Sequence, residues 1–397
     1  MNDNSNYSRH VPVSRRVRDI SPSATKEMAN LAAKTGGCVS LGQGVPSFAT
    51  PDHIVAAVTE IMHSDPASGK YTLQSGMIQL RECIAGYLLQ EKNISVNPEN
   101  EICVTVGGME ALLTTIFTVI DPGDEIILPS PTYASYIEQV LLAGGIPKFV
   151  PLTRDWGLDL PAIRQAVNPK TKAVMLCNPG NPTGTVFSDD QTMELGRMAV
   201  DCNFVIITDE AYDYILYSNE TLTSLLGLKT MREHIISVFS LSKKYALTGW
   251  RIGWVAADQR WMEQIMKVHD ATTICAPTPS QFAALVALEG DQECVTHMRN
   301  ALVRRRTLCC SRLDGLSEYF SYVPPKGAFY VMAKYLFSDS PSREVATRLL
   351  QEAKVITVPG GSFGPGGEGH LRLSFGGKSD EINEAFDRIE RWLVRFG

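Results

Sequence analysis

The segment SLSKKYALTGWRIGW, which begins at Ser240, sets two adjacent lysines, Lys243 and Lys244, among hydroxyl groups and an arginine. Ser240 and Ser242 precede Lys243, and Arg251 lies eight residues after it. A hairpin-like return of the chain would bring the guanidinium back toward the hydroxyls, and these groups together would bind a dianion. A lysine held beside them among apolar residues would have a lowered pKa and could attack an aldehyde.

Two glycines follow another apolar run, in VTVGGMEALL. Gly107 and Gly108 stand between a predicted strand and a helix that we expect to begin near Met109. In parallel α/β sheets, ligands bind beyond the carboxyl ends of the strands. Backbone N–H groups at a helix start, with no side chains in the way, suit a phosphate. A tight strand-to-helix turn explains the two glycines equally well.

Three more predicted strands end in polar or aromatic residues. In LPSPTYASY, Tyr133 could lay its ring on a planar ligand, although an aromatic residue in a turn is more often packing. In LCNPGNPTG, two Asn-Pro steps hold Asn178 and Asn181 in a rigid turn, unless the prolines serve only to end the strand. In IITDEAYDY, Asp209 leaves a buried strand and Tyr212 follows. A carboxylate there is costly unless it meets a cation or a donor, and a helix cap is the alternative.

A single ligand could use all five of these strand ends. Pyridoxal 5'-phosphate has a flat ring, a phosphate, a ring nitrogen that needs an anion, a phenolic oxygen that needs donors, and an aldehyde. We therefore expect a pyridoxal-phosphate site at this edge of the sheet. The motifs give no reason to expect a metal.

Length and composition set the class of protein. The chain has 397 residues, of which 44% are hydrophobic and 20% charged, so two domains are expected. A net charge of -6 gives no electrostatic reason to bind nucleic acid or an anionic membrane. The nine cysteines show no CxxC spacing, which favours reduced thiols over disulfides or zinc. No stretch resembles a secretory signal or approaches the roughly 18 apolar residues of a membrane span. We expect a soluble, cytoplasmic protein.

The elements that would position these residues follow from seven short apolar runs between about residues 100 and 260. The runs are almost continuously apolar, as expected for strands of a mostly parallel sheet flanked by helices. The predicted fold class is therefore α/β, with a smaller α+β domain. The predicted division is an N-terminal segment 1–48 that contributes to the small domain, a large cofactor-binding domain 49–290 and a small C-terminal domain 291–397.

Four motifs, SLSKKYALTGWRIGW, NPGNPTG, TDEAYDYILY and GEGHLRLSFG, resemble those of the class I/II aminotransferases among the fold-type I pyridoxal-phosphate enzymes. The likeness runs from LGQGVPSFATPDHI to the C-terminal helix, and the entrance segment ISPSATKEM is similar to the prokaryotic aspartate/aromatic branch. The resemblance implies a homodimer that moves an amino group from an L-amino acid to a 2-oxo acid by a ping-pong mechanism.

The resemblance also implies a role for each cofactor contact. Lys243 would bind the cofactor covalently and then act as general base and acid, whereas Lys244 occupies a variable position. Asp209 would pair with the protonated ring nitrogen, and Tyr71 would reach the phosphate of the neighbouring subunit's cofactor. The other cofactor contacts that it implies are Gly107, Gly108, Met109, Ser240, Ser242 and Arg251 at the phosphate, Tyr133 on the ring face, and Asn181 and Tyr212 at the phenolic oxygen.

The substrate contacts come from the same resemblance. Arg372 would hold the α-carboxylate in a bidentate pair, completed by Gly44 and the amide of Asn181. Ser23 and Thr25 would line the pocket.

The side-chain preference is inferred from Met109. It stands where aspartate-preferring members of the branch often have a lysine, which favours aromatic or other large neutral amino acids with 2-oxoglutarate. Aspartate is the alternative substrate, and a C–S β-lyase or another pyridoxal-phosphate reaction is the alternative chemistry. A transcription regulator is disfavoured because the family pattern leaves no room for a DNA-binding module.

Overall fold

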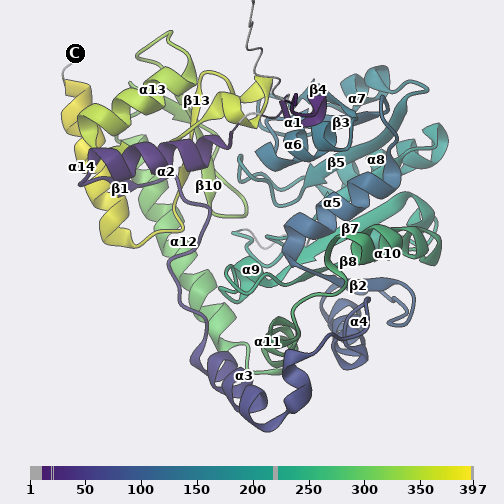
Figure 1. Ribbon diagram of the computed structural model, residues 1–397. Coiled ribbons are helices and arrows are strands. Elements are labelled where there is room, and N and C mark those ends of the chain that lie inside the picture. Colours follow the sequence, from purple (N-terminus) through teal and green to yellow (C-terminus); the bar gives the residue numbers. More distant parts are fainter. Residues whose placement is uncertain (1–10, 19, 21, 218–221, 395–397) are drawn as a thin grey trace, which may run out of the picture.

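The computed structural model describes residues 11–18, 20, 22–217 and 222–394 (Figure 1). Its centre is a seven-stranded sheet in the order β2-β8-β7-β6-β5-β3-β4. In this sheet β8 alone runs opposite to the other six strands, so the predicted mostly parallel sheet is confirmed. The strands are β2 Ile102–Thr105, β3 Glu125–Ser130, β4 Ile146–Pro151, β5 Thr171–Cys177, β6 Val205–Asp209, β7 Ile235–Ser240 and β8 Gly253–Ala257.

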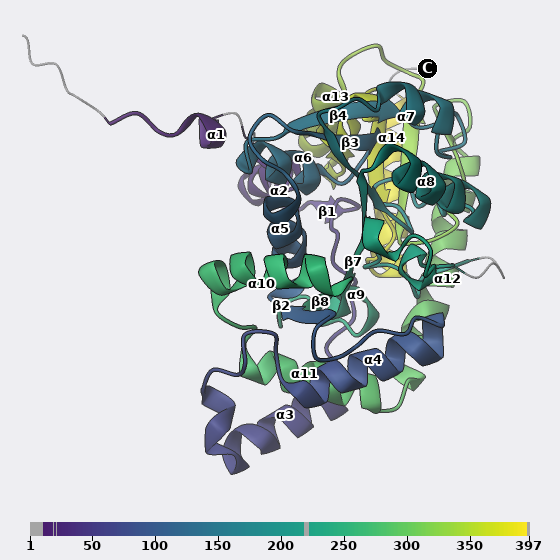
Figure 2. The ribbon, with the colours of Figure 1, turned by 90° about the vertical axis from the view of Figure 1, so that its right-hand side faces the viewer.

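The strands read as continuous apolar runs because the sheet is covered on both faces. In β6, Val205 and Ile207 belong to one hydrophobic cluster and Ile206 to another. Apolar side chains of the helices belong to both clusters. Helices lie on both faces of the sheet (Figures 1 and 2). Those on the first side are α5 Gly107–Val119, α6 Ala134–Leu142 and α10 Gln259–Thr273. Those on the second are α3 Asp52–Ser64, α4 Ile78–Lys92, α7 Leu160–Ala166, α8 Asp189–Cys202 and α11 Thr278–Glu289.

A smaller antiparallel sheet follows the long helix α12 (Glu293–Asp314). Its order is β12-β13-β10-β9, and the C-terminal helix α14 (Ser379–Leu393) packs against α12. The strands are β9 Phe320–Tyr322, β10 Tyr330–Tyr335, β12 Val358–Pro359 and β13 His370–Ser374. The remaining helices of this part and of the chain start are α1 Arg15–Arg18, α2 Ala24–Thr35 and α13 Ser342–Arg348.

The N-terminal segment joins these C-terminal elements. β1 (Val39–Ser40) pairs with β11 (Val355–Ile356) in parallel, and α2 lies beside the smaller sheet (Figure 1). Because one hydrophobic cluster runs from the large sheet into α14, the two parts share a core. The division at residues 48 and 290 stays a prediction.

The topology brings the predicted strand ends to one edge. β2, β3, β5, β6 and β7 all point the same way, so the residues that follow them meet there. β7 and β8 form the hairpin-like return, with Ser240 paired to Gly253, and the short helix α9 (Leu241–Lys244) lies between them. Arg251 therefore returns to Ser240, as the sequence predicts.

Three surveys of the described residues bear on other functions. None of the helices in these residues is both long and apolar enough to cross a membrane. All nine cysteines fall within them, and each is free. Within the same residues, no three His, Cys, Asp or Glu side chains gather as they would around a metal ion.

Candidate active site

A cavity of about 560 Å³ opens at the carboxyl ends of these strands. It is lined by side chains from the large sheet, from α2 and from the smaller sheet, and two of the predicted residues, Gly107 and Tyr71, are not part of its lining. The predicted residues that line it are Ser23, Thr25, Gly44, Gly108, Met109, Tyr133, Asn181, Asp209, Tyr212, Ser240, Ser242, Lys243, Arg251 and Arg372.

One end of the cavity is a cradle for an anion. α5 begins at Gly107, two residues before the expected start, so its first turn lies against Ser240 and Arg251. Gly107 has a φ of +74°, and a Cβ there would meet Nη2 of Arg251 at 2.7 Å, so glycine is required. The Arg251 guanidinium donates to the Thr248 carbonyl at 3.0 Å and has no carboxylate partner among the described residues. The helix start and this guanidinium together suit a phosphate.

Lys243 lies between two arginines and one carboxylate. Its Nζ donates to the backbone carbonyl of Gly44 at 2.6 Å. Its pKa is lowered to about 8, chiefly by burial and then by the positive charges of Arg251 and Arg372, while the charge of Asp209 opposes the shift. A substantial fraction of the amine is therefore neutral near physiological pH, as a nucleophile or general base requires.

Asp209 ends β6 as a buried carboxylate. Tyr136 donates its hydroxyl to Oδ2 at 2.7 Å, and the N–H of Ala211 donates to Oδ1 at 3.1 Å. Burial raises the pKa of Asp209, and these two donors oppose that effect. Because Asp209 makes no ion pair with any described residue, a cationic ligand atom would supply the missing partner. We did not predict Tyr136, although its place three residues after Tyr133 near the start of α6 could have signalled it.

Arg372 on β13 is buried, with 3% of its surface exposed, and it meets only neutral partners. Its Nη1 donates to Oδ1 of Asn181 at 3.2 Å and its Nη2 to the Gly42 carbonyl at 2.6 Å. Its Nε has no partner among the described residues. The rings of Tyr330 and Phe363 lie 4.6 Å and 5.0 Å from the guanidinium. A buried guanidinium without a counterion suits an incoming carboxylate.

Tyr330 is a second residue that sequence reasoning missed. Its hydroxyl lies 2.9 Å from that of Tyr212, and a Cβ at Gly44 would meet it at 3.0 Å. It comes from β10, far from the quoted motifs, so only the tertiary structure brings it here. Asn178, in contrast, accepts from the N–H of Phe187 at 3.0 Å and serves the turn, while Asn181 faces the cavity.

A buried His–Glu pair holds the backbone just before the start of α5, next to the anion cradle. Nδ1 of His269 lies 2.9 Å from Oε1 of Glu110, and Oε2 of Glu110 accepts from the N–H of Val106 at 3.0 Å. Nε2 of His269 lies 2.9 Å from the carbonyl of Gln74. The pair thus ties the start of α5 to the loop that carries Tyr71, which is 78% exposed.

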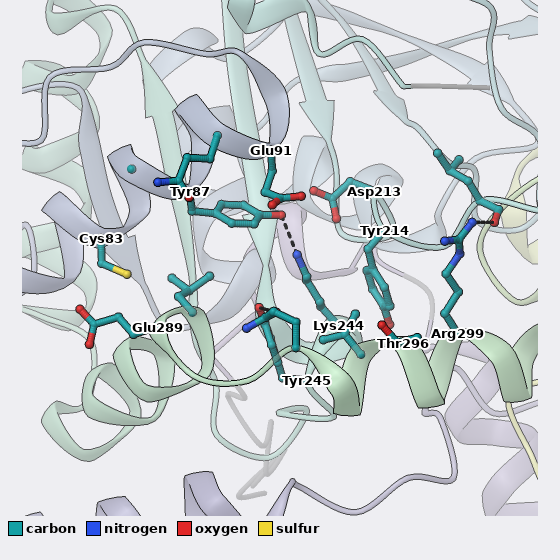
Figure 3. A pocket seen from close by; sticks show the side chains of 16 residues that line it. Cys83, Tyr87, Glu91, Asp213, Tyr214, Lys244, Tyr245, Glu289, Thr296 and Arg299 are labelled. Atoms are coloured by element: carbon teal, nitrogen blue, oxygen red, sulfur yellow. Dashed lines mark hydrogen bonds between the residues drawn. The ribbon is translucent and has the colours of Figure 1, made fainter. Parts of the chain in front are cut away.

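Lys244 points into a different cavity, of about 750 Å³, between α4 and the start of α12 (Figure 3). Its Nζ donates to the hydroxyl of Tyr87 at 3.0 Å and lies 4.4 Å from the centre of that ring. Burial lowers the pKa of Lys244, but the charges of Asp213 and Glu91 oppose this shift. The second lysine therefore has a side-chain partner in its own chain and lines a cavity other than that of Lys243.

Comparisons with known proteins agree with this geometry. The family described as aminotransferase class I and II matches residues 37–389. The aromatic-amino-acid aminotransferase 2 of Thermococcus litoralis is 34% identical over 96% of this chain and 98% of its own. The aspartate aminotransferase of Pyrococcus abyssi is 35% identical, with the same coverage. The solved structure of Thermus thermophilus aspartate aminotransferase with maleate has a TM-score of 0.89 and 34% identity, covering 96% of this chain and 100% of that one.

Proposed function

Since this chain belongs to the class I and II aminotransferases, a pyridoxal-phosphate-dependent family, we propose that the cavity around Lys243 is its active site. We propose further that the enzyme prefers aromatic and other large neutral L-amino acids as donors and 2-oxoglutarate as acceptor. The observation that supports this substrate preference is that the uncharged side chain of Met109 lines the cavity.

The charges left without partners in the cavity fit the cofactor and the substrate. Among the described residues, Arg251 and Arg372 have no carboxylate partner and Asp209 has no cationic partner, and the Lys243 amine is partly neutral. A phosphate, a substrate carboxylate, a ring nitrogen and an aldehyde would match these four groups in turn. Asn181, whose Oδ1 already accepts from Arg372, keeps its amide N–H groups for a ligand oxygen.

Each residue then has one task in catalysis. When bound, the cofactor supplies a ring that withdraws electrons from the substrate Cα. Arg372 holds the α-carboxylate, which fixes the Cα–H bond relative to Lys243. Lys243 would anchor the cofactor, and its neutral amine would take the proton from the substrate Cα as general base and return it as general acid. Asp209 keeps the ring nitrogen protonated.

The substrate side chain would enter an apolar region. Met109 and Leu112 of α5, together with Tyr133 and Phe363, line the cavity, and the Tyr133 hydroxyl lies 3.8 Å from the Met109 sulfur. A thioether accepts apolar and aromatic groups readily, whereas it supplies no charge to a carboxylate placed beside it. Aspartate stays the second candidate because the relatives named for aromatic and for aspartate substrates are equally similar to this chain.

A homodimer is part of the proposal. The loop that carries Tyr71 is held by Gln281, which donates to Thr72 at 2.9 Å and accepts from the N–H of Met77 at 2.7 Å. Tyr71 and Leu73 nevertheless stay 78% and 63% exposed. A fixed loop with exposed apolar tips is suited to a second subunit, where Tyr71 would reach the phosphate. The cytoplasm is the proposed location.

The test is a panel of donors assayed with 2-oxoglutarate, pyruvate and oxaloacetate. We expect phenylalanine, tyrosine, leucine and methionine to exceed aspartate in kcat/KM, with 2-oxoglutarate as the best acceptor. A strong preference for aspartate would contradict the argument from Met109 and leave the family unchanged. Release of pyruvate and ammonia from one substrate, without transfer to an acceptor, would indicate a lyase instead.

A further inference from the structure

Lys26 is a cation at the cavity that the proposed mechanism does not use. Among the described residues that line the cavity, the cations are Lys26, Lys243, Arg251 and Arg372. The last three are matched to the cofactor and to the α-carboxylate. Lys26 lies in the first turn of α2, at the exposed mouth of the cavity beside Ser23 and Thr25.

A dicarboxylate substrate creates a need for such a cation. 2-Oxoglutarate carries a second carboxylate beyond the one that Arg372 holds. That group would enter the region walled by Met109, Leu112 and Phe363, whose own side chains carry no charge. Placing a carboxylate there without a counterion is costly. A cation that reaches in from the mouth removes this cost.

We propose that Lys26 binds the distal carboxylate of dicarboxylate substrates and does not contact neutral substrates. The inference rests on the proposed use of 2-oxoglutarate as acceptor. A lysine suits this task because its ammonium is a point charge on a flexible four-carbon stem. Lys26 can extend into the cavity for a dicarboxylate and stay in solvent when an aromatic side chain enters.

Glu138 on α6 offers the resting partner of Lys26. It is partly buried, and burial raises its pKa while the charge of Lys26 lowers it. The two side chains make no ion pair within 4 Å, so Lys26 is not locked in place. The ammonium of Lys26 therefore breaks no ion pair with Glu138 when it approaches a substrate carboxylate.

The experiment titrates the holoenzyme with two unreactive acids, glutarate and pentanoate, which differ by one carboxylate. We expect Lys26→Met to weaken glutarate binding about tenfold, the loss of one charge-assisted hydrogen bond, and to change pentanoate binding less than twofold. Lys26→Arg should restore most of the glutarate affinity. Lys34→Met, on the same helix and away from the cavity, should change neither and is the matched control.

The possible results separate this inference from the proposed function. Unchanged glutarate binding in Lys26→Met, or an equal loss for both acids, would overturn the role of Lys26 while leaving 2-oxoglutarate as a valid acceptor. A wild-type enzyme that transaminates pyruvate but binds neither glutarate nor 2-oxoglutarate would overturn both proposals. A selective loss for glutarate, with rescue by arginine, supports Lys26.

Discussion

Two neighbouring lysines face two different environments in this aminotransferase. Lys243 opens onto the cavity at the strand ends, and Lys244 onto the cavity between α4 and α12 (Figure 3). Burial lowers the pKa of both amines. Around Lys243 the two arginines lower it further, whereas around Lys244 the nearby carboxylates of Asp213 and Glu91 oppose the shift.

The comparison teaches that burial alone does not make a lysine reactive. The ammonium of Lys244 donates a hydrogen bond to the hydroxyl of Tyr87 and lies over the ring of the same residue. Within the described part of the chain, Lys243 donates to the carbonyl of Gly44 alone, and the arginines of its cavity have no carboxylate partner. The proposed difference in reactivity rests on the sign of the surrounding charge and on whether the amine has a side-chain partner.

Replacing each lysine in turn should give the largest difference in activity between the two sites. We expect Lys243→Ala to lower kcat by at least about 10³-fold, because it removes both the covalent anchor and the proton carrier. Lys244→Ala should keep kcat within about threefold. Steady-state transamination and visible spectra of the two purified variants measure this. Loss of activity in the Lys244 variant alone would mean that the roles are reversed.

Replacing the carboxylate in each cavity, Asp209 near Lys243 and Asp213 near Lys244, extends the comparison. Asp209→Ala should lower kcat and kcat/KM together by roughly 10²-fold, because an electrostatic interaction used mainly in the transition state is lost. The matched control is Asp213→Asn near Lys244, which should change kcat little. Cofactor content must be measured in both variants. A fully loaded Asp209 variant with normal kcat would remove Asp209 from this role.

The pH dependence of cofactor uptake tests the pKa difference directly. The pKa of Lys243 is lowered to about 8 from an ordinary value of 10.5, so the neutral amine increases as pH rises through about 8. The uptake rate of pyridoxal phosphate by the apoenzyme should therefore rise with pH, with a midpoint near 8, and then level off. Arg372→Leu should move the midpoint upward, since one repelling charge is gone. A rate that still climbs steeply above pH 10 would contradict the lowered pKa.

The smallest effect is expected for Lys244→Met, which keeps the size of the side chain and removes its charge. The lost hydrogen bond to Tyr87 is offset by the lost cost of burying an ammonium. The thermal midpoint should change by no more than about 4 °C, as measured by calorimetry of the holoenzyme. A shift of more than 10 °C would show that Lys244 is a central structural element.

Much of the fold could be predicted from local sequence. All seven strands of the large sheet lie in the apolar runs, because strands covered on both faces need no polar alternation. The α5 start at Gly107 differed from the expected start near Met109, because both glycines join the first turn of the helix.

The site was predictable where it lies at strand ends and not where remote segments enter it. Tyr330 and His269 come from β10 and α10, and no spacing relates them to the motifs. Lys26 directly follows Thr25 in the quoted segment ISPSATKEM, but that resemblance gave it no role. Tyr136 could have been predicted, because it lies three residues after Tyr133, about one helical turn away. Tyr71 does not line the cavity of its own chain, so its proposed contact depends on a second subunit.

The most direct test is to find which lysine carries the cofactor. The holoenzyme is reduced with borohydride, which fixes the cofactor on its lysine, and the digested protein is sequenced by tandem mass spectrometry. Fragment ions that break the chain between Lys243 and Lys244 assign the added mass to one of them. We predict that the cofactor mass lies on Lys243, with Lys244 unmodified. The mass on Lys244, or on a lysine outside this segment, would contradict the central claim.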